Sequence, residues 1–243
     1  MALDTHIAWC DDSLNAWWGC TEVDPACDNC YAKTLSERFD KAKWGQGEPR
    51  MFVKSWRNTL QAIQRKARAE GRRRRVFVES MGDLFDNQVP DEWRRDLFEA
   101  IRQVPECDFL LLTKRIGNAR AMLPSDWPVG FEHCWLGISA GTQQALDRDA
   151  PKLFEIPASV RWMSAEPLLE PLWLGAGPAW DWIVIGGESG RHRRNPGLPA
   201  FMALASRCEA LRIPLFVKQA PAARPGTPFG IEVLDRWKEW PNA

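Results

Sequence analysis

Histidine, tyrosine, net charge and long apolar runs are all scarce in this sequence. Its 243 residues include three histidines and one tyrosine, and 32 basic side chains balance 32 acidic ones. The histidines His6, His133 and His192 are isolated from one another, which argues against a histidine metal site. Zero net charge gives no bulk attraction to nucleic acid, so such a contact would need a local basic patch. Because the first thirty residues contain no long apolar run, we expect neither a signal peptide nor a membrane span.

Cysteine and tryptophan, by contrast, are used in distinctive ways. The seven cysteines are an odd number with three clustered, which suits a reducing cytoplasm better than a disulfide framework. Cys107, Cys134 and Cys208 sit within apolar patterns and are expected in the core, whereas Cys10 is near enough in sequence to be a fourth ligand of the cluster. The 14 tryptophans are expected to pack in the core, with aromatic platforms for a planar ligand as the alternative.

Three cysteines lie close together near the N-terminus, at Cys20, Cys27 and Cys30. Six residues separate the first pair and two separate the second, and Pro25 breaks any helix between them. A helical pattern begins directly after Cys30, so the cysteines lie on a loop that leads into a helix. A structural zinc ion normally takes four protein ligands, and an iron–sulfur cube normally takes four cysteines. Three thiolates on one loop would therefore leave one iron of a cube open to another ligand.

Short apolar segments alternate with helical patterns through most of the chain. Strands are predicted at residues 15–18, 76–78, 109–113, 134–139, 160–164, 182–185 and 215–217. Helices are predicted at residues 31–39, 56–70, 90–104, 142–154 and 198–211. Strands that are apolar throughout are typical of parallel βαβ units. We expect one α/β domain over residues 1–243, a partial parallel (β/α) barrel of six or seven strands. The alternative is an open doubly wound sheet, and residues 220–243 are expected to form an irregular tail that covers one mouth.

Polar side chains follow the predicted strands with regularity. In a parallel barrel the carboxyl ends of the strands meet at one mouth, so these side chains should ring a single cavity together with the cysteines. The residues at these strand ends are Glu79, Ser80, Asp83, Thr113, Lys114, Arg115, Ser139, Ser164, Glu166, Gly186, Gly187, Glu188, Ser189, Lys218 and Gln219.

The cysteine block and six further blocks, taken in order, resemble a phage-encoded three-cysteine-motif family that looks like a divergent branch of the radical S-adenosylmethionine (SAM) superfamily. The first block reads CDNCYA at residues 27–32. The others lie at residues 76–85, 109–115, 135–139, 161–171, 183–190 and 214–219, so the resemblance covers roughly residues 5–220. It departs from the superfamily in the first cysteine spacing, where radical SAM enzymes have three residues. The resemblance implies a radical SAM-like barrel in the cytoplasm, which is the host cytoplasm if the chain is phage-encoded.

The resemblance also implies two cofactors, a [4Fe-4S] cluster on Cys20, Cys27 and Cys30 and SAM on its open iron. Residues implied to bind SAM are Tyr31, Glu79, Ser80, Asp83, Lys114, Ser139, Glu166, Gly186, Gly187 and Glu188. The turn from Glu79 would take the amino group, Lys114 or Arg115 the carboxylate, Ser139 and Glu166 the ribose, and the two glycines the adenine. Residues implied to face the substrate are Arg115, Arg191, Lys218 and Gln219.

Each of these roles has a structural alternative. Tyr31 would otherwise pack in the core at the helix start, and Lys114 with Arg115 would otherwise form a surface pair. Glu166 would otherwise pair with an arginine such as Arg161, and Gly186 would otherwise serve a tight turn.

The function implied is hydrogen abstraction by a 5′-deoxyadenosyl radical, with an external electron donor. The substrate would be a nucleic-acid base or modified nucleotide, with isomerisation of a base side chain in phage DNA as one option. The arginine runs at residues 72–75 and 191–194 could supply local contacts, although the first is expected to be a solvated helix end. The alternatives are a zinc-stabilised nucleic-acid-binding protein and a catalytically silent interaction partner.

Overall fold

A curled, seven-stranded parallel sheet forms the centre of the protein. The computed structural model describes residues 3–175, 179–190, 192–219 and 237–241. The strands, in their order across the sheet, are β1 (Asp12–Leu14), β4 (Arg74–Val78), β5 (Cys107–Thr113), β6 (Cys134–Ser139), β7 (Val160–Ala165), β8 (Trp182–Gly186) and β9 (Leu215–Gln219). Each strand pairs in parallel with the next, and β1 and β9 are the two edges. The predicted α/β fold, a partial parallel barrel, is confirmed.

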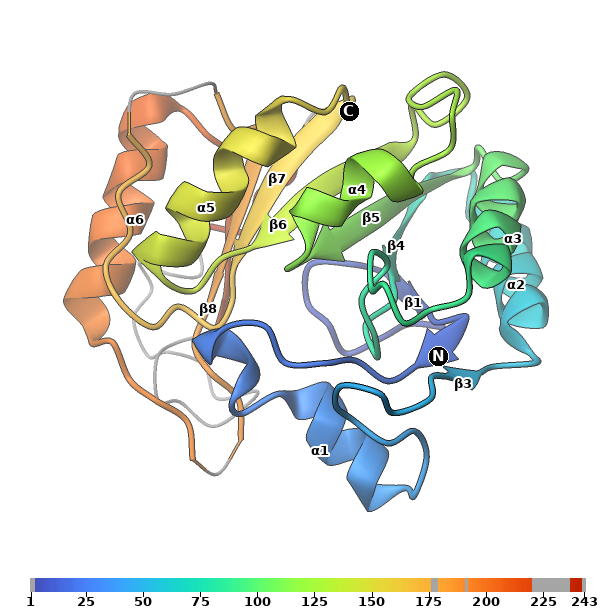
Figure 1. Ribbon diagram of the computed structural model, residues 1–243. Helices are drawn as coiled ribbons and strands as arrows, with labels where there is room; N and C mark the ends of the chain where they lie inside the picture. The colour runs from blue at the N-terminus through green and yellow to red at the C-terminus, as the bar shows by residue number, and fades with distance from the viewer. Residues whose placement is uncertain (1–2, 176–178, 191, 220–236, 242–243) are drawn as a thin grey trace.

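Helices cover the convex face of this sheet, as Figure 1 shows. They are α2 (Trp56–Glu70), α3 (Asp91–Arg102), α4 (Ile116–Met122), α5 (Gln143–Phe154) and α6 (Leu198–Leu211). In α2 the predicted spacing is realised, because Trp56, Leu60, Ile63 and Ala67 are all buried. Gly71 ends the helix with a left-handed φ of 62°. No helix in the described part of the chain is both long and apolar enough to cross a bilayer.

The first strand of the sheet lies earlier than predicted. Residues 15–18 were expected to form it, but β1 covers Asp12–Leu14, and β2 (Trp17–Trp18) pairs antiparallel with β3 (Met51–Phe52) in a separate small sheet. The polar sequence of β1 hid it, since Asp12 is fully buried only because Arg74 from β4 binds its carboxylate at 2.7 Å.

The arginine run at residues 72–75 was expected to be a solvated helix end, and this holds for its first half only, because Arg72 and Arg73 follow α2 with side chains that are 46% exposed. Its second half begins β4, and Arg74 is 2% exposed, bound to Asp12 and Glu70. Arg72 and Arg73 are each paired with a carboxylate as well. A search for apolar runs could not detect the buried ion pair between Arg74 and Asp12.

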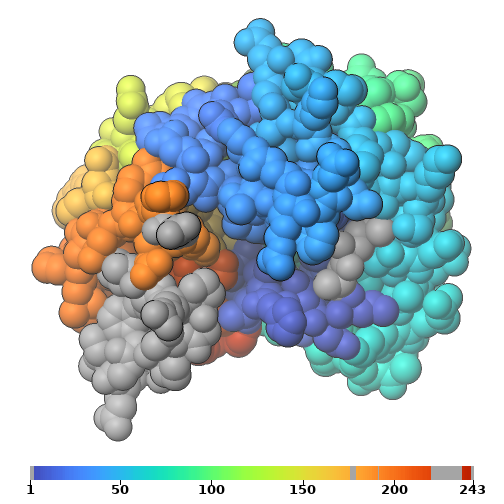
Figure 2. All heavy atoms as spheres, turned by 90° about the horizontal axis from the view of Figure 1, so that it is seen from below, coloured from blue at the N-terminus to red at the C-terminus, as the bar shows by residue number. Residues whose placement is uncertain are grey.

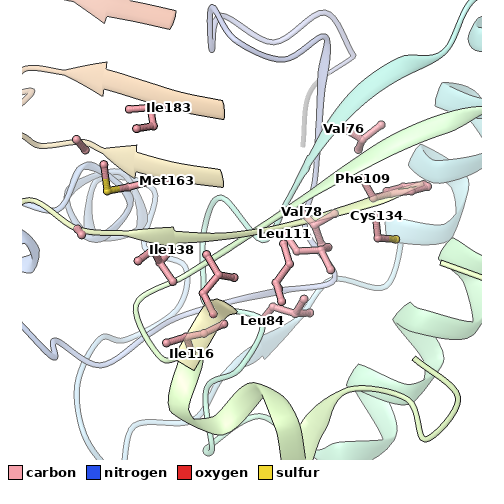
Figure 3. Packing of buried hydrophobic residues seen from close by; sticks show 14 of the residues in the cluster. Val76, Val78, Leu84, Phe109, Leu111, Ile116, Cys134, Ile138, Met163 and Ile183 are labelled. Atoms are coloured by element: carbon pink, nitrogen blue, oxygen red, sulfur yellow. The ribbon is translucent and has the colours of Figure 1, made fainter. Parts of the chain in front are cut away.

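The two faces of the sheet bury two different sets of side chains. Alternate strand residues such as Val76, Phe109 and Met163 belong to the core on the helix side, and Figure 3 shows Val76 beside Phe109 and Met163 near Ile183. The intervening residues fill the concave side of the sheet, where Trp162 packs against Trp9 and Trp182 at ring-centroid distances of 5.4 and 5.1 Å. These tryptophans are therefore core residues rather than open platforms.

The described end of the chain, residues 237–241, pairs with the edge strand β9 and packs against the concave-side cluster. Lys238 bridges Phe216 in antiparallel fashion, and Trp240 donates from its indole nitrogen to the Trp9 carbonyl at 3.0 Å. Trp240 also lies under the Arg75 guanidinium, 4.0 Å from ring centroid to Cζ. The rest of the predicted tail, residues 220–236 and 242–243, lies outside the described residues.

Candidate active site

A cavity of about 990 Å³ opens at the carboxyl ends of the strands. Figure 1 shows α1 (Tyr31–Arg38) and the loop before it lying below the sheet, and Figure 2 views this side, with residues 20–50 in blue. The predicted site residues that line the cavity are Cys20, Cys27, Cys30, Tyr31, Glu79, Ser80, Asp83, Lys114, Arg115, Ser139, Glu166, Gly187, Glu188, Lys218 and Gln219. Gly186 is not among the lining residues, and Arg191 lies outside the described residues.

All three loop cysteines are free thiols. A short 3-10 helix (Pro25–Cys27), capped by the Asp24 carboxylate, carries Cys27, and Cys30 is the N-cap of α1. Within the residues that the structure describes, no three His, Cys, Asp or Glu side chains come close enough together to bind a single ion. The cysteine ligands of a [4Fe-4S] cluster do not need to converge on a single ion, because each of them binds a different iron. The three thiols at one cavity are the number of cysteine ligands that the predicted cluster requires.

Cys10 stands apart from this loop. It is 8% exposed, packs on the concave side of the sheet beside Trp9, and directs its thiol to the Ile7 carbonyl at 3.8 Å. It does not line the cavity. Burial also raises the pKa of Cys10, as expected for an inert core thiol.

Arg115 lines the cavity and directs its guanidinium at the cysteine loop. Its Nη1 lies 3.3 Å from Cys20 Sγ and 3.1 Å from Asp83 Oδ2, and its Nη2 donates to the Thr21 carbonyl. Burial and the nearby Asp83 carboxylate raise the pKa of the Cys20 thiol to about 12, although the Arg115 guanidinium opposes this shift. Arg115 was predicted to contact the substrate. In the structure its guanidinium also contacts the sulfur of Cys20.

Asp83 is fully occupied by protein donors. Its Oδ1 accepts from the Phe85 N–H at 3.0 Å and the Thr113 hydroxyl at 2.7 Å. Its Oδ2 accepts from the Lys114 N–H and from Arg115, both at 3.1 Å. The carboxylate therefore orders the turn that carries these residues, and leaves little capacity for a ligand.

Glu79 combines burial with backbone strain. It has a φ of 59°, in the left-handed region, and is 2% exposed. Its Oε1 accepts from the Ala16 N–H at 2.6 Å, whereas the buried Oε2 has no partner within hydrogen-bond geometry among the described residues. Burial raises the pKa of this carboxyl well above 4.5. Because Glu79 lines the cavity, a cationic group bound beside it would favour the charged form of this carboxyl, so Glu79 fits the ammonium of an amino acid moiety.

Ser80, the residue after Glu79, is hydrogen-bonded to two other residues near the cavity. Ser80 exchanges hydrogen bonds with the Asn15 side chain, and its carbonyl accepts from the Tyr31 hydroxyl at 2.9 Å. Tyr31 is 47% exposed, so it lies at the cavity wall rather than in the core that was its alternative.

Glu166 forms an ion pair with Lys218 across the far side of the cavity. The alternative partner, Arg161, instead donates from Nε to the Ile156 carbonyl, so the predicted Arg161 pairing was wrong. Gly186 lies against this carboxylate, since a Cβ there would be 2.9 Å from Glu166 Cγ. The absence of a side chain at Gly186 therefore makes room for Glu166. Ser139 donates to the Glu166 carbonyl at 3.3 Å.

Glu188 is bound by side chains from the segments around the cysteine loop. Asn29 donates to its Oε2 at 3.0 Å, and Arg194 binds both of its oxygens. Burial raises the pKa of Glu188, but these donors, with the Arg194 N–H, hold it below its usual range. Arg194 also binds the Pro25 carbonyl and Asp28. Glu188 thus anchors the cysteine loop to the end of β8, where SAM contact had been predicted.

Several residues of the site were not selected from the sequence. Asn29, Trp44 and the N-terminal residues Thr5–Trp9 line the cavity, and Arg194 holds its edge. Asn29 could have been found, because it lies between two of the cysteines. The N-terminal residues carry no local signal and reach the cavity only through the fold.

Gln219 and Gly187 complete the wall beside β9. The Gln219 amide donates to the Gly187 carbonyl at 2.6 Å and to the Ser189 hydroxyl at 3.1 Å.

A family model matches residues 4–227 of the chain. The chain belongs to the family described as "Protein of unknown function (DUF5131)". No curated protein matches it. Among solved structures, a cysteine-to-serine mutant of spore photoproduct lyase is similar at 12% identity and a TM-score of 0.49, covering 88% of this chain and 65% of that one. A double mutant of the same lyase, with bound AdoMet and dinucleoside spore photoproduct, is similar at 12% identity and a TM-score of 0.48, covering 84% and 62%. This member of the family therefore spans just under two thirds of the length of either lyase chain.

Proposed function

We propose that this protein is a radical SAM enzyme that holds a [4Fe-4S] cluster on Cys20, Cys27 and Cys30. The observation that supports this most directly is three free thiols on one loop, facing a cavity that is also lined by the buried carboxyl group of Glu79. Three thiols leave one iron for an exogenous ligand, and the Glu79 carboxyl group offers a place for the ammonium of SAM.

Other cavity residues offer partners for the remaining groups of SAM. Lys114 has no hydrogen bond or ion pair from its amine within the described part of the chain, so it is available for the carboxylate. Glu166 and Ser139 lie at neighbouring strand ends and would bind the ribose diol. Gly187 would allow close approach of the adenine, and Tyr31 would border it. Asp83, Ser80, Glu188 and Gly186 would act by holding these residues in place.

When bound, the cluster and SAM supply reductive cleavage to a 5′-deoxyadenosyl radical, which abstracts hydrogen from a substrate carbon. The chain's own residues bind and orient the reactants and exclude water. A cavity of about 990 Å³ lies at the upper end for small-molecule sites, which leaves room for a substrate beside SAM.

We propose a nucleic-acid base or modified nucleotide as that substrate, with isomerisation of a base side chain as one reaction. Lys218, Gln219, Arg115 and Arg191 are the residues proposed to face it. The electron would come from an external donor, and the reaction would take place in the cytoplasm, that of the host if the chain is phage-encoded.

The test is anaerobic reconstitution with iron and sulfide, followed by titration with SAM. We expect a brown protein with four irons per chain, and an electron paramagnetic resonance (EPR) signal after reduction that SAM alters. Stoichiometric zinc with no iron uptake would instead favour a zinc-stabilised binding protein. A cluster whose EPR signal does not change with SAM would contradict the radical SAM reaction. It would favour the alternative of a catalytically silent interaction partner.

A further inference from the structure

Of the three loop cysteines, Cys20 has an environment of its own. Its sulfur lies 3.3 Å from Arg115 Nη1, within reach of an N–H···S hydrogen bond. No such cationic donor contacts Cys27 or Cys30 in the described residues, and the sulfur of Cys27 instead lies 3.9 Å from an Asp24 oxygen. One thiol of the three therefore receives a charged donor.

The position of Arg115 is set by a chain of buried contacts. The Thr113 hydroxyl accepts from the Arg115 N–H at 2.8 Å and donates to Asp83 at 2.7 Å. Asp83 in turn binds the guanidinium, and the side chains of Arg115 and Asp83 are only 9% and 7% exposed. A guanidinium held by a carboxylate and a backbone carbonyl keeps one N–H edge fixed in direction.

Thr21, the neighbour of Cys20 in the loop, is held by a second set of hydrogen bonds. The Thr21 hydroxyl accepts from Arg50 and from Gln88, both at 2.8 Å, and Arg50 is bound to the fully buried Asp86. Thr21 and its neighbour Cys20 are thereby fixed before any cofactor binds. The donor at Cys20 is thus a preorganised part of the site rather than a flexible surface contact.

We infer that Arg115 is a positioning residue that holds Cys20 and raises the reduction potential of the cluster through its N–H···S hydrogen bond and its charge. This inference rests on the proposed function. Reduction adds negative charge to a cluster, so a nearby cation and a donor to sulfur favour the reduced form. The Asp83 carboxylate offsets part of the positive charge of Arg115. Arg115 and Asp83 should therefore shift the reduction potential of the cluster in opposite directions.

The experiment is a redox titration of the reconstituted protein, with the reduced cluster followed by EPR. We expect Arg115→Gln to shift the midpoint potential to more negative values and Asp83→Asn to shift it to more positive values. Arg115→Lys keeps the charge and loses the planar fork, so its shift should be smaller and in the direction of Arg115→Gln. Arg120→Gln removes an exposed arginine of α4 and should leave the potential unchanged.

The outcomes separate this inference from the proposed function. A wild-type protein that takes up no cluster contradicts the proposed function itself. A loaded Arg115→Gln protein with the wild-type potential overturns the inference alone. If Arg115→Gln folds by circular dichroism but retains less iron, the positioning role is supported, and the potential of Arg115→Lys then decides the electrostatic role.

Discussion

Arg194 joins the segment after β8 to the cysteine loop, where its Nη1 lies 2.9 Å from the Asp28 carboxylate. The same guanidinium binds Glu188, which is 3% exposed, and the carbonyl of Pro25. The loop therefore depends on a contact between residues more than 160 positions apart in the chain. Arg115 plays the corresponding part at the Cys20 end of the loop.

Removing the Arg194 contact should loosen the cysteine loop. We expect Arg194→Ala to lower the free energy of unfolding by about 1–2 kcal/mol, the lower part of the range for charged hydrogen bonds, because this side chain is 36% exposed. It should also reduce the iron retained after reconstitution. Chemical denaturation and iron analysis measure the two effects. Arg193→Ala is the matched control, and equal losses in both variants would speak against a specific contact.

Each loop cysteine should be necessary for the cluster. Cys20→Ala, Cys27→Ala and Cys30→Ala should each abolish the brown colour of anaerobically purified protein, because two thiolates cannot hold a cube. Cys10→Ala should keep the colour, since Cys10 does not line the cavity. The measurement is iron and sulfide content per chain. Loss of iron in a folded Cys10→Ala protein would indicate that Cys10 is a ligand of the cluster.

Glu166 should affect SAM without affecting iron. We expect Glu166→Gln to weaken SAM binding by about 1–3 kcal/mol, the scale of one hydrogen bond to a charged group, while the cluster is retained. The affinity is read from SAM titration of the reduced EPR signal. Glu170→Gln, on the same loop but exposed, is the control. An unchanged affinity would assign Glu166 to the Lys218 ion pair alone.

Glu79 should make the stability of the protein depend on pH. Its pKa is raised on folding, so the folded chain retains a proton that the unfolded chain loses above about pH 4.5. The free energy of unfolding should therefore fall as pH rises from there toward the folded pKa. Glu79→Gln keeps an acceptor for the Ala16 N–H and should flatten this slope, whereas exposed Glu92→Gln should not. Urea denaturation from about pH 4 to about pH 8 tests this, and identical slopes in all three proteins would refute it.

Gly137 should tolerate no side chain. A Cβ there would lie 2.5 Å from the Trp162 ring on the concave side of the sheet. We expect Gly137→Ala to destabilise the fold by about 1–3 kcal/mol, the cost typical of overpacking. Gly117→Ala in α4 meets only the flexible Lys152 amine at 3.8 Å and should be neutral or slightly stabilising. Thermal denaturation compares the two, and equal melting temperatures would contradict the packing described.

The main pattern of strands and helices can be predicted from the sequence. Apolar strands such as β5 and periodic helices such as α2 carry local signals, because burial on both strand faces or on one helix face shows directly in composition. The strand-end rule then predicted one cavity, since parallel strands bring their carboxyl ends to the same side. Fifteen of the predicted site residues line that cavity.

The pairing of polar groups, by contrast, depends on the three-dimensional fold. Asp12 could enter the sheet because Arg74 binds it, and Glu188 could be buried because Arg194 and Asn29 bind it. Desolvating a charge is unfavourable without such a partner, and the partner is brought close by the fold rather than by sequence proximity. The strand-end pattern therefore predicted many of the side chains that reach the cavity, whereas three-dimensional proximity brought Thr5–Trp9 there and determined which polar groups are paired.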